Sequence, residues 1–319
     1  MMHQVLVEAL KLAVSEALTP DPSRTGLLLS GGLDSAVIQA IARLEHLYCI
    51  TWPEQDNISV AKLAARGFPV TEVTFTREEM LDVLPEIHRL THGTGSWSQV
   101  CQWFAARRAK EDGIEVLLTG ECADELFGGY TRYRILHHLD KIFSDYRLVA
   151  YQGIVRHVLG FESPRDAAAR MLARTVSLEQ AFALIDQHAS HATSSVEMAR
   201  LVDLHHGLPP LLENETACLQ AFGAEARYPF GHPAVRETAA RFFPDERVTT
   251  EYCKAPLRNA ARHLGVLDMI VEEQTKKGLA IPQVWRPEGV PLWSTKWFVD
   301  LLKTAAGSSQ AVSLKHTPQ

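Results

Sequence analysis

Cysteine is scarce in this sequence, with five cysteines in 319 residues. None of them forms the closely spaced pair of a zinc site or a redox motif: they are Cys49, Cys101, Cys122, Cys218 and Cys253. Their odd number argues against a disulfide framework. We therefore expect reduced thiols in a cytoplasmic protein.

Long hydrophobic runs and an excess of positive charge are also missing. Charged residues interrupt each apolar stretch before it reaches the length of a membrane span, so we expect neither a transmembrane segment nor a signal peptide. Lys and Arg number 32 against 38 Asp and Glu, which leaves a formal net charge of -6. This balance predicts a globular protein that has neither a membrane nor a nucleic acid as its partner.

What is present in the first part of the chain is an alternation of strand and helix signals. An amphipathic helix ends at residues 19–22, and strands are then expected at 26–30, 47–52, 70–75 and 115–119, with helices between them. This order predicts a parallel sheet covered on both faces. We place an α/β core at about 20–135, a helical portion at about 136–303 and a flexible tail at 304–319.

The first motif is the segment SGGLDS at residues 30–35. Two glycines between a buried strand and a helix let the backbone turn tightly and present amide groups to an anion. Asp34 would repel that anion unless it holds a metal ion. The alternative is a simple turn in which Asp34 or Ser35 caps the helix. Neither GxxxxGK[ST] nor GxGxxG occurs, which argues against kinase-like, GTPase and dinucleotide-binding proteins.

The second motif is GECADELFGGY at residues 120–130, directly after the fourth expected strand. Its three carboxylates, Glu121, Asp124 and Glu125, are costly to place together unless a cation binds there. If the strand order is 3-2-1-4, both motifs face one cleft at the switch point of the sheet. The alternative is an acidic helix start.

These motifs resemble those of a known family. SGGLDS is similar to the pyrophosphate-binding loop of the ATP pyrophosphatases, and GECADELFGGY closely resembles the GEGADELFGGY-type segment of asparagine synthetases and β-lactam synthetases. Residues 224–230, 254–258 and 275–278 resemble the family segments E-x-R-x-P-F, K-x-x-L-R and R-x-K-x-G-F. The resemblance implies one synthetase domain over residues 1–303. Its fold would be a parallel doubly wound sheet of the ATP-pyrophosphatase (adenine nucleotide α-hydrolase-like) type with an all-helical C-terminal portion.

The resemblance also implies roles for individual residues. Lys276 and Glu121 would be catalytic, the first on the developing negative charge and the second in proton removal from the amine. Asp34 and Asp124 would hold Mg²⁺. ATP and pyrophosphate would be bound by Leu28, Ser30, Gly31, Gly32, Asp34, Ser35, Thr119, Gly120, Asp124 and Lys254. By spacing alone, Lys276 is a solvated surface residue.

Two further positions carry conditional expectations. Cys122 stands where the family usually has glycine, which matters only if that position needs a positive φ. Glu225 and Arg227 are expected to form a mainly structural pair.

The implied reaction is ATP-dependent, AMP-forming amide synthesis in which a carboxylate is adenylated and an amine then attacks. Glutamine-using members begin with a glutaminase domain that has an N-terminal cysteine nucleophile, whereas Met2 and His3 stand here, so we expect no such domain. The amine would be ammonia, an amine from a separate glutaminase subunit, or an amino group of the substrate itself.

The last of these sources would give intramolecular closure, as in β-lactam synthetases and the macrolactam-forming lasso peptide cyclases. The family's acidic-Pro acceptor segment is not recognisable at residues 91–97, and Gly231-His232 replaces the usual Asp after P-F, which argues against aspartate as the carboxylate substrate. An alternative of another class is a nucleotide-binding relic without catalysis. The presence of Asp34, Glu121, Asp124 and Lys276 argues against it.

We assign no functional role to the adjacent histidines. His205 and His206 should point apart on a helix, as should His137 and His138, so we expect surface or satisfied polar positions.

Overall fold

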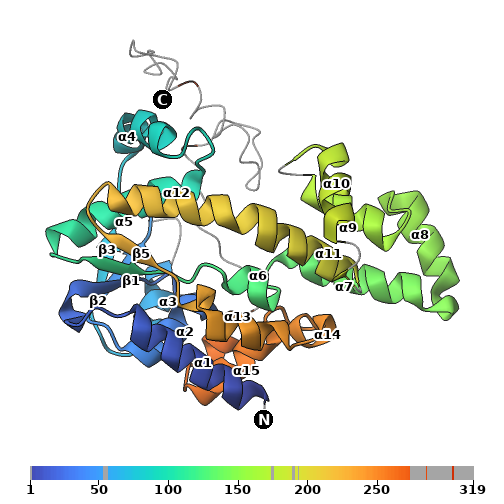
Figure 1. The fold of residues 1–319 in the computed structure, drawn as a ribbon, viewed down its shortest axis with the longest axis horizontal. Helices are drawn as coiled ribbons and strands as arrows, with labels where there is room; N and C mark the ends of the chain where they lie inside the picture. Colours follow the sequence, from blue (N-terminus) through green and yellow to red (C-terminus); the bar gives the residue numbers. More distant parts are fainter. Residues whose placement is uncertain are drawn as a thin grey trace.

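The computed structural model describes residues 2–52, 57–173, 176–188, 191–192, 194–273, 285 and 304. Its centre is a five-stranded sheet in which every neighbouring pair is parallel, in the order β3-β2-β1-β4-β5 (Figure 1). The strands are β1 (Thr25–Leu28), β2 (His46–Ile50), β3 (Val70–Val73), β4 (Val116–Leu118) and β5 (Glu225–Arg227). The four expected strands and the order 3-2-1-4 are confirmed, with ends that differ by a few residues.

Helices cover both faces of this sheet because successive strand residues point to opposite sides. Leu27 and Leu29 pack on one face against α1 (Met2–Ala17), α2 (Leu33–Ala42), α3 (Asn57–Ala64), α13 (Pro233–Ala240) and α15 (Ala255–His263). Tyr48 and Ile50 pack on the other face against α4 (Arg77–Leu90), α5 (Trp97–Glu111) and α12 (Leu208–Gln220). Figure 1 shows these two layers on either side of the strands.

The strand β5 corrects the expectation that the C-terminal portion is all helical. It pairs in parallel with β4 through Glu225, Ala226 and Arg227, at the edge of the sheet. Three residues, two of them charged, give neither the length nor the apolar alternation by which a strand is recognised in a sequence. An edge strand tolerates such polarity because one side of it faces solvent.

A second, all-helical lobe lies beside the sheet (Figure 1). It comprises α7 (Thr131–Ser144), η2 (Tyr146–Leu148), α8 (Val149–Leu159), α9 (Pro164–Leu172), α10 (Leu178–His188) and α11 (Ser195–Val202). Its own core includes Tyr133, Leu136, Ala168, Ile185 and Val196, all of which are nearly inaccessible to solvent. The lobe begins directly after the second motif, so α7 connects the core of the lobe to that motif.

One long helix joins the lobe to the sheet. It runs through α11, a π-helical turn η4 (Asp203–Gly207) and α12 without a break. The pair Pro209 and Pro210 suggests a stop in the sequence, yet both lie in the first turn of α12. A proline cannot donate the backbone hydrogen bond of a regular helix. The π turn before Pro209 changes the local hydrogen bonding, so the helix continues through the proline pair.

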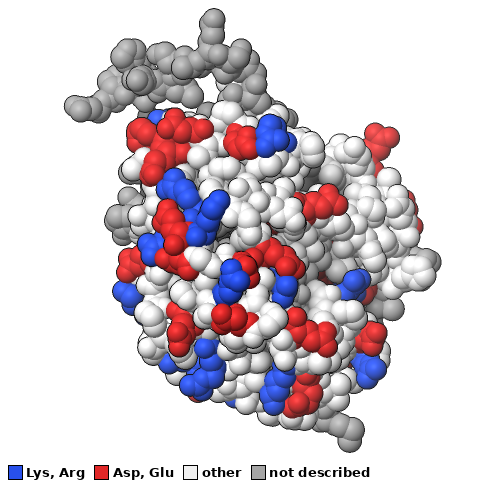
Figure 2. All heavy atoms as spheres, turned by 60° about the vertical axis from the view of Figure 1, so that its left-hand side comes forward, with Lys and Arg blue, Asp and Glu red and all other residues white. Residues whose placement is uncertain are grey.

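Shorter elements complete the fold: η1 (Pro22–Arg24), α6 (Ala123–Phe127), η5 (Pro229–Gly231), α14 (Pro244–Arg247) and α16 (Asp268–Val271). Within the described part of the chain, none of the helices has the length and apolarity needed to cross a bilayer. Acidic and basic side chains are interspersed on the face shown in Figure 2, without a broad area of one sign.

Candidate active site

The loop after β1 is shaped by Gly31 and by hydroxyl groups. Gly31 has φ +77°, and a Cβ there would lie 2.8 Å from the backbone nitrogen of Ala61 in α3, so only glycine fits. The amide of Gly32, the residue before α2, donates to Ser30 Oγ over 3.2 Å. Ser30 Oγ also lies 3.3 Å from Ser35 Oγ. The loop is therefore already folded at the positive end of α2.

The second motif reaches the same place because β1 and β4 are neighbours in the sheet. A Cβ on Gly120 would lie 2.9 Å from the Cβ of Asp34, so the two motifs are in direct contact. The short helix α6 then places Asp124 in its first turn. The expectation that both motifs face one site is confirmed.

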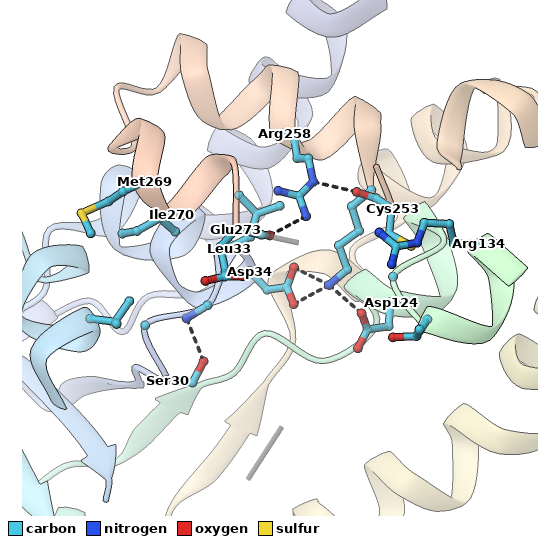
Figure 3. A pocket seen from close by; sticks show the side chains of 16 residues that line it. Ser30, Leu33, Asp34, Asp124, Arg134, Cys253, Arg258, Met269, Ile270 and Glu273 are labelled. Atoms are coloured by element: carbon cyan, nitrogen blue, oxygen red, sulfur yellow. Dashed lines mark hydrogen bonds and ion pairs between the residues drawn. The ribbon is translucent and has the colours of Figure 1, made fainter. Parts of the chain in front are cut away.

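A buried lysine joins the two aspartates. Lys254 Nζ lies 2.6 Å from Asp34 Oδ2 and 2.6 Å from Asp124 Oδ1, and only 7% of Lys254 is exposed. Figure 3 shows the carboxylates of Asp34 and Asp124 turned toward the same ammonium group, with dashed lines for the ion pairs. Burial by itself would lower the pKa of Lys254, but Asp124 and Asp34 outweigh it and raise this pKa above its usual value.

Gly129 makes room for this cluster. A Cβ at residue 129 would lie 1.9 Å from Asp124 Oδ1 and 2.0 Å from Lys254 Cε. No side chain can occupy that space while the ion pair is in place. The GGY end of the second motif is thus part of the site.

The cluster forms one wall of a pocket of about 270 Å³. Polar and charged groups line one side of the pocket, and Leu33, Met269 and Ile270 line another side, which is apolar (Figure 3). Val60 is a further apolar residue of the lining. Six residues expected to bind ATP or metal line this pocket: Ser30, Gly31, Gly32, Asp34, Asp124 and Lys254.

Comparison with known proteins fits this geometry. The sequence model of the family described as asparagine synthase matches residues 6–310. The chain belongs to the asparagine synthase family. Asparagine synthetase B [glutamine-hydrolyzing] of Escherichia coli is 32% identical over 148 residues, which are 39% of this chain and 26% of that protein. Asparagine synthetase [glutamine-hydrolyzing] 2 of Oryza sativa subsp. japonica is 31% identical over 124 residues, 33% of this chain and 21% of that protein. Each match thus spans about a quarter or less of the relative's length.

Other expected site residues of this asparagine synthase family chain do not line the pocket. Leu28 ends β1, Ser35 lies in α2, and Thr119, Gly120 and Glu121 lie on the loop after β4. The amide of Glu121 faces Thr119 Oγ1 at 3.5 Å. Lys276 lies outside the described residues.

Several residues that line the pocket were not among the predicted site residues. Arg134 of α7 lies beside Cys253, and Glu273 follows α16 (Figure 3). Arg258 of α15 donates to the backbone oxygens of Cys253 at 2.7 Å and Glu273 at 2.9 Å. Arg258 belongs to the K-x-x-L-R segment, and this segment could have indicated its place in the site. No sequence motif indicates Arg134, because its position depends on the direction in which α7 runs from the second motif.

Two strained residues occur at this site. Of the described non-glycine residues five have positive φ, and Cys122, at +73°, and Lys254, at +57°, are two of them. Such backbone strain is often retained at functional sites. The condition attached to Cys122 is therefore met, because glycine would adopt this conformation more easily.

A β-branched residue at position 122 should expose this strain. We expect Cys122→Val to lower the free energy of unfolding by about 2 kcal/mol, because valine is strongly disfavoured at positive φ. Cys49→Val is the matched control, since Cys49 is equally buried but lies in the extended strand β2. Denaturant unfolding of both variants measures their free energies of unfolding. Equal losses of stability in the two variants would contradict the prediction that Cys122 is strained.

Glu225 and Arg227 behave as the structural pair that was expected. Arg227 donates to both carboxylate oxygens of Glu225 at 2.8 Å. It also donates to the backbone oxygens of Ala17 and Leu18 at the end of α1, at 3.2 and 3.1 Å. The pair thus ties β5 to the first helix.

The expectation for His205 and His206 is wrong in one respect. The ring of His205 stacks on His188 with centroids 5.1 Å apart, and His206 Nε2 lies 3.1 Å from His188 Nε2. The π turn η4 changes the angle between successive side chains, so both rings reach the end of α10. Within the described residues, no three metal-ligating side chains form a metal site.

Proposed function

We propose that this chain is an ATP-dependent, AMP-forming amide synthetase that adenylates a carboxylate and transfers the acyl group to ammonia or another amine. The observation that carries the proposal is the meeting of Asp34, Asp124 and Lys254 beside the loop of residues 30–35. Family membership supports it, because the relatives named above are asparagine synthetases.

The two sides of the pocket suit the two ends of ATP. Leu33, Val60 and Ile270 offer an apolar surface for the base. Amide groups at the start of α2 offer positive potential to the phosphates, and a metal ion between Asp34 and Asp124 would offset the negative charge that Lys254 alone does not balance. Positive groups fixed in these places would stabilise the negative charge that develops on the departing pyrophosphate more than they stabilise the bound nucleotide.

Mg²⁺ fits the two aspartates. Both carboxylates are already turned toward a single cation, the ammonium of Lys254, and carboxylate oxygens are preferred ligands of Mg²⁺. Asp34 and Asp124 would hold the ion, which would neutralise charge on the phosphates. Lys276, which lies outside the described residues, remains a proposed second cation for the same charge.

The proposed reaction has two steps. A substrate carboxylate oxygen bonds to the α-phosphorus of ATP while the bond to the β-phosphate breaks, and pyrophosphate leaves. The amine nitrogen then bonds to the acyl carbon, the carbon–oxygen bond to AMP breaks, and Glu121 accepts the proton released from nitrogen. The products are an amide, AMP and pyrophosphate.

The test is identification of both products. The protein is incubated with ATP, Mg²⁺, pools of carboxylates and ammonia, and nucleotides are separated from organic products for mass spectrometry. We expect AMP together with an acid whose hydroxyl has been exchanged for an amino group. Loss of one water from a single substrate would establish intramolecular closure instead, and formation of ADP would contradict the mechanism.

A further inference from the structure

A second pocket, of about 360 Å³, lies on the far side of α6 from the pocket described above. Its charged residues are Arg200, Arg236 and Glu237, and its apolar ones include Leu126, Leu204 and Pro233. The two pockets share no lining residue. Leu126 and Asp124 are two residues apart on α6, so their side chains point in nearly opposite directions.

A buried cluster with an excess of positive charge borders the second pocket. Arg200 and Arg247 are only 7% and 3% exposed, and both pair with one carboxylate, that of Glu197. Arg200 Nε lies 2.9 Å and Arg247 Nη1 3.0 Å from Glu197 Oε2. Burial and the neighbouring charge of Arg200 lower the pKa of Arg247 to about 10. Two guanidinium groups thus share one carboxylate, and a further negative group nearby would be stabilising.

Hydrogen-bond donors of this cluster remain available. Arg200 lines the pocket and uses three of its five N–H groups, two on Glu197 and one on the backbone oxygen of Glu125. Arg247 donates to the backbone oxygen of Ala239, a residue of the pocket wall, at 3.0 Å. The buried Nε of Arg247 has no hydrogen-bond partner among the described residues.

The rest of the lining restricts the kind of ligand that fits. Arg236 is exposed on α13 and brings a second guanidinium to the pocket, which favours an anion. Glu237, the next residue of the same helix, would repel a simple anion such as phosphate but attract an ammonium group. Leu126 and Leu204 offer an apolar surface beside these charges. Charges of both signs beside an apolar surface match the carboxylate, the amine and the side chain of an amino acid.

We propose that the second pocket binds a free amino acid with an apolar side chain, whose carboxylate contacts Arg200 and Arg236 and whose ammonium contacts Glu237. The planar guanidinium group presents its N–H donors in the geometry that a carboxylate accepts. The cavity volume lies in the range of small-molecule sites.

Arg200 connects this pocket to the proposed ATP site. Its Nη1 donates to the backbone oxygen of Glu125 at 3.2 Å, and Glu125 directly follows Asp124 in α6. A ligand that engages Arg200 therefore acts on the short helix that positions Asp124. Binding in one pocket should change the affinity of the other, by the same factor in both directions. This coupling rests on the proposed function, whereas binding of the amino acid does not.

Calorimetric titration with each common amino acid, at concentrations up to about 10 mM, tests the site. We expect an amino acid with an apolar side chain to bind the parent protein and Asp34→Asn alike. Arg236→Gln should weaken binding about 10- to 100-fold, because it removes a charged donor. Arg241→Gln is the matched control, since Arg241 is exposed at the end of the same helix but does not line the pocket.

Three results of this titration would overturn the site. One is that none of the amino acids binds. Another is that inorganic phosphate binds in preference to every amino acid. The third is that Asp34→Asn abolishes binding while Arg236→Gln retains it, which would place the amino acid in the other pocket.

The role of Glu237 has a test of its own. The carboxylic acid that has the same side chain but lacks the amine should bind the parent protein about 10-fold more weakly than the amino acid. In Glu237→Gln the two ligands should bind with similar affinity. Equal affinities in the parent protein would overturn the contact with the amine.

A second titration, with ATP and Mg²⁺ in the presence and absence of the amino acid, tests the coupling. An unchanged affinity for ATP overturns the connection through Arg200 and leaves the binding site standing. A protein that binds the amino acid through Arg236 but does not bind ATP counts against the proposed function instead.

Discussion

Lys254→Met is expected to lower kcat/KM for AMP formation about 1000-fold. The ammonium of Lys254 touches both Asp34 and Asp124 at 2.6 Å, and loss of one fixed charge that stabilises a transition state costs about 100- to 1000-fold. Methionine keeps the length and apolar stem of the side chain. A loss of activity in this variant is therefore due to the missing charge. Steady-state kinetics at a saturating concentration of the carboxylate measures the loss of kcat/KM.

The same variant should also respond differently to Mg²⁺. Without the ammonium, two partly buried carboxylates face each other with no cation between them, which destabilises the fold in the absence of metal. Mg²⁺ can replace the missing charge, so it should raise the melting temperature of Lys254→Met more than that of the parent protein. Lys62→Met is the control, because Lys62 forms an exposed pair with Glu72 at 3.1 Å. Equal responses to Mg²⁺ would count against a metal site between the aspartates.

Gly129→Ala is expected to abolish most activity while the fold survives. The added Cβ would lie 1.9 Å from Asp124 Oδ1 and 2.0 Å from Lys254 Cε. Both atoms belong to ends of side chains, which can swing away without a shift of the backbone. We expect AMP formation to fall by about 100-fold or more, with a loss of only about 1–3 kcal/mol in stability from overpacking.

The matched control for this variant is Gly153→Ala. Gly153 lies in α8, and a Cβ there would meet no atom within 4 Å. Alanine should stabilise that helix by about 0.5–1 kcal/mol and leave turnover unchanged. Full activity of Gly129→Ala would show that the contact between Lys254 and Asp124 is not needed for catalysis.

Local patterns were sufficient to predict much of the fold. The apolar runs that became β1 to β4 alternate with helical periods, and this fixes a parallel sheet because each crossover needs a helix. The order 3-2-1-4 brings residues 30–35 beside residues 120–130, so the meeting of the two motifs follows from topology. Lys254 was assigned to the site by resemblance alone, since nothing local to it indicates partners more than 100 residues away.

What could not be predicted depends on tertiary contacts. The strand β5 has only three residues, and its pairing with β4 is decided by the packing around it. The π turn η4 carries one helix through Pro209 and brings His205 and His206 to His188. Glu215 is buried on α12 but looks like a solvent-facing acid in the segment LLENETACLQ, because the sequence does not show which face of α12 is covered.

The most direct test of the account is exchange of radiolabelled pyrophosphate into ATP in the presence of Mg²⁺ and pooled carboxylates. Adenylation is reversible, so label should enter ATP only when the correct carboxylate is present. Asp34→Asn should abolish that exchange, because Asp34 belongs to the loop of residues 30–35 and contacts Lys254. Carboxylate-dependent exchange that needs Asp34 is the result the account predicts. Exchange that persists in Asp34→Asn, or ATP consumption that yields ADP, would contradict it.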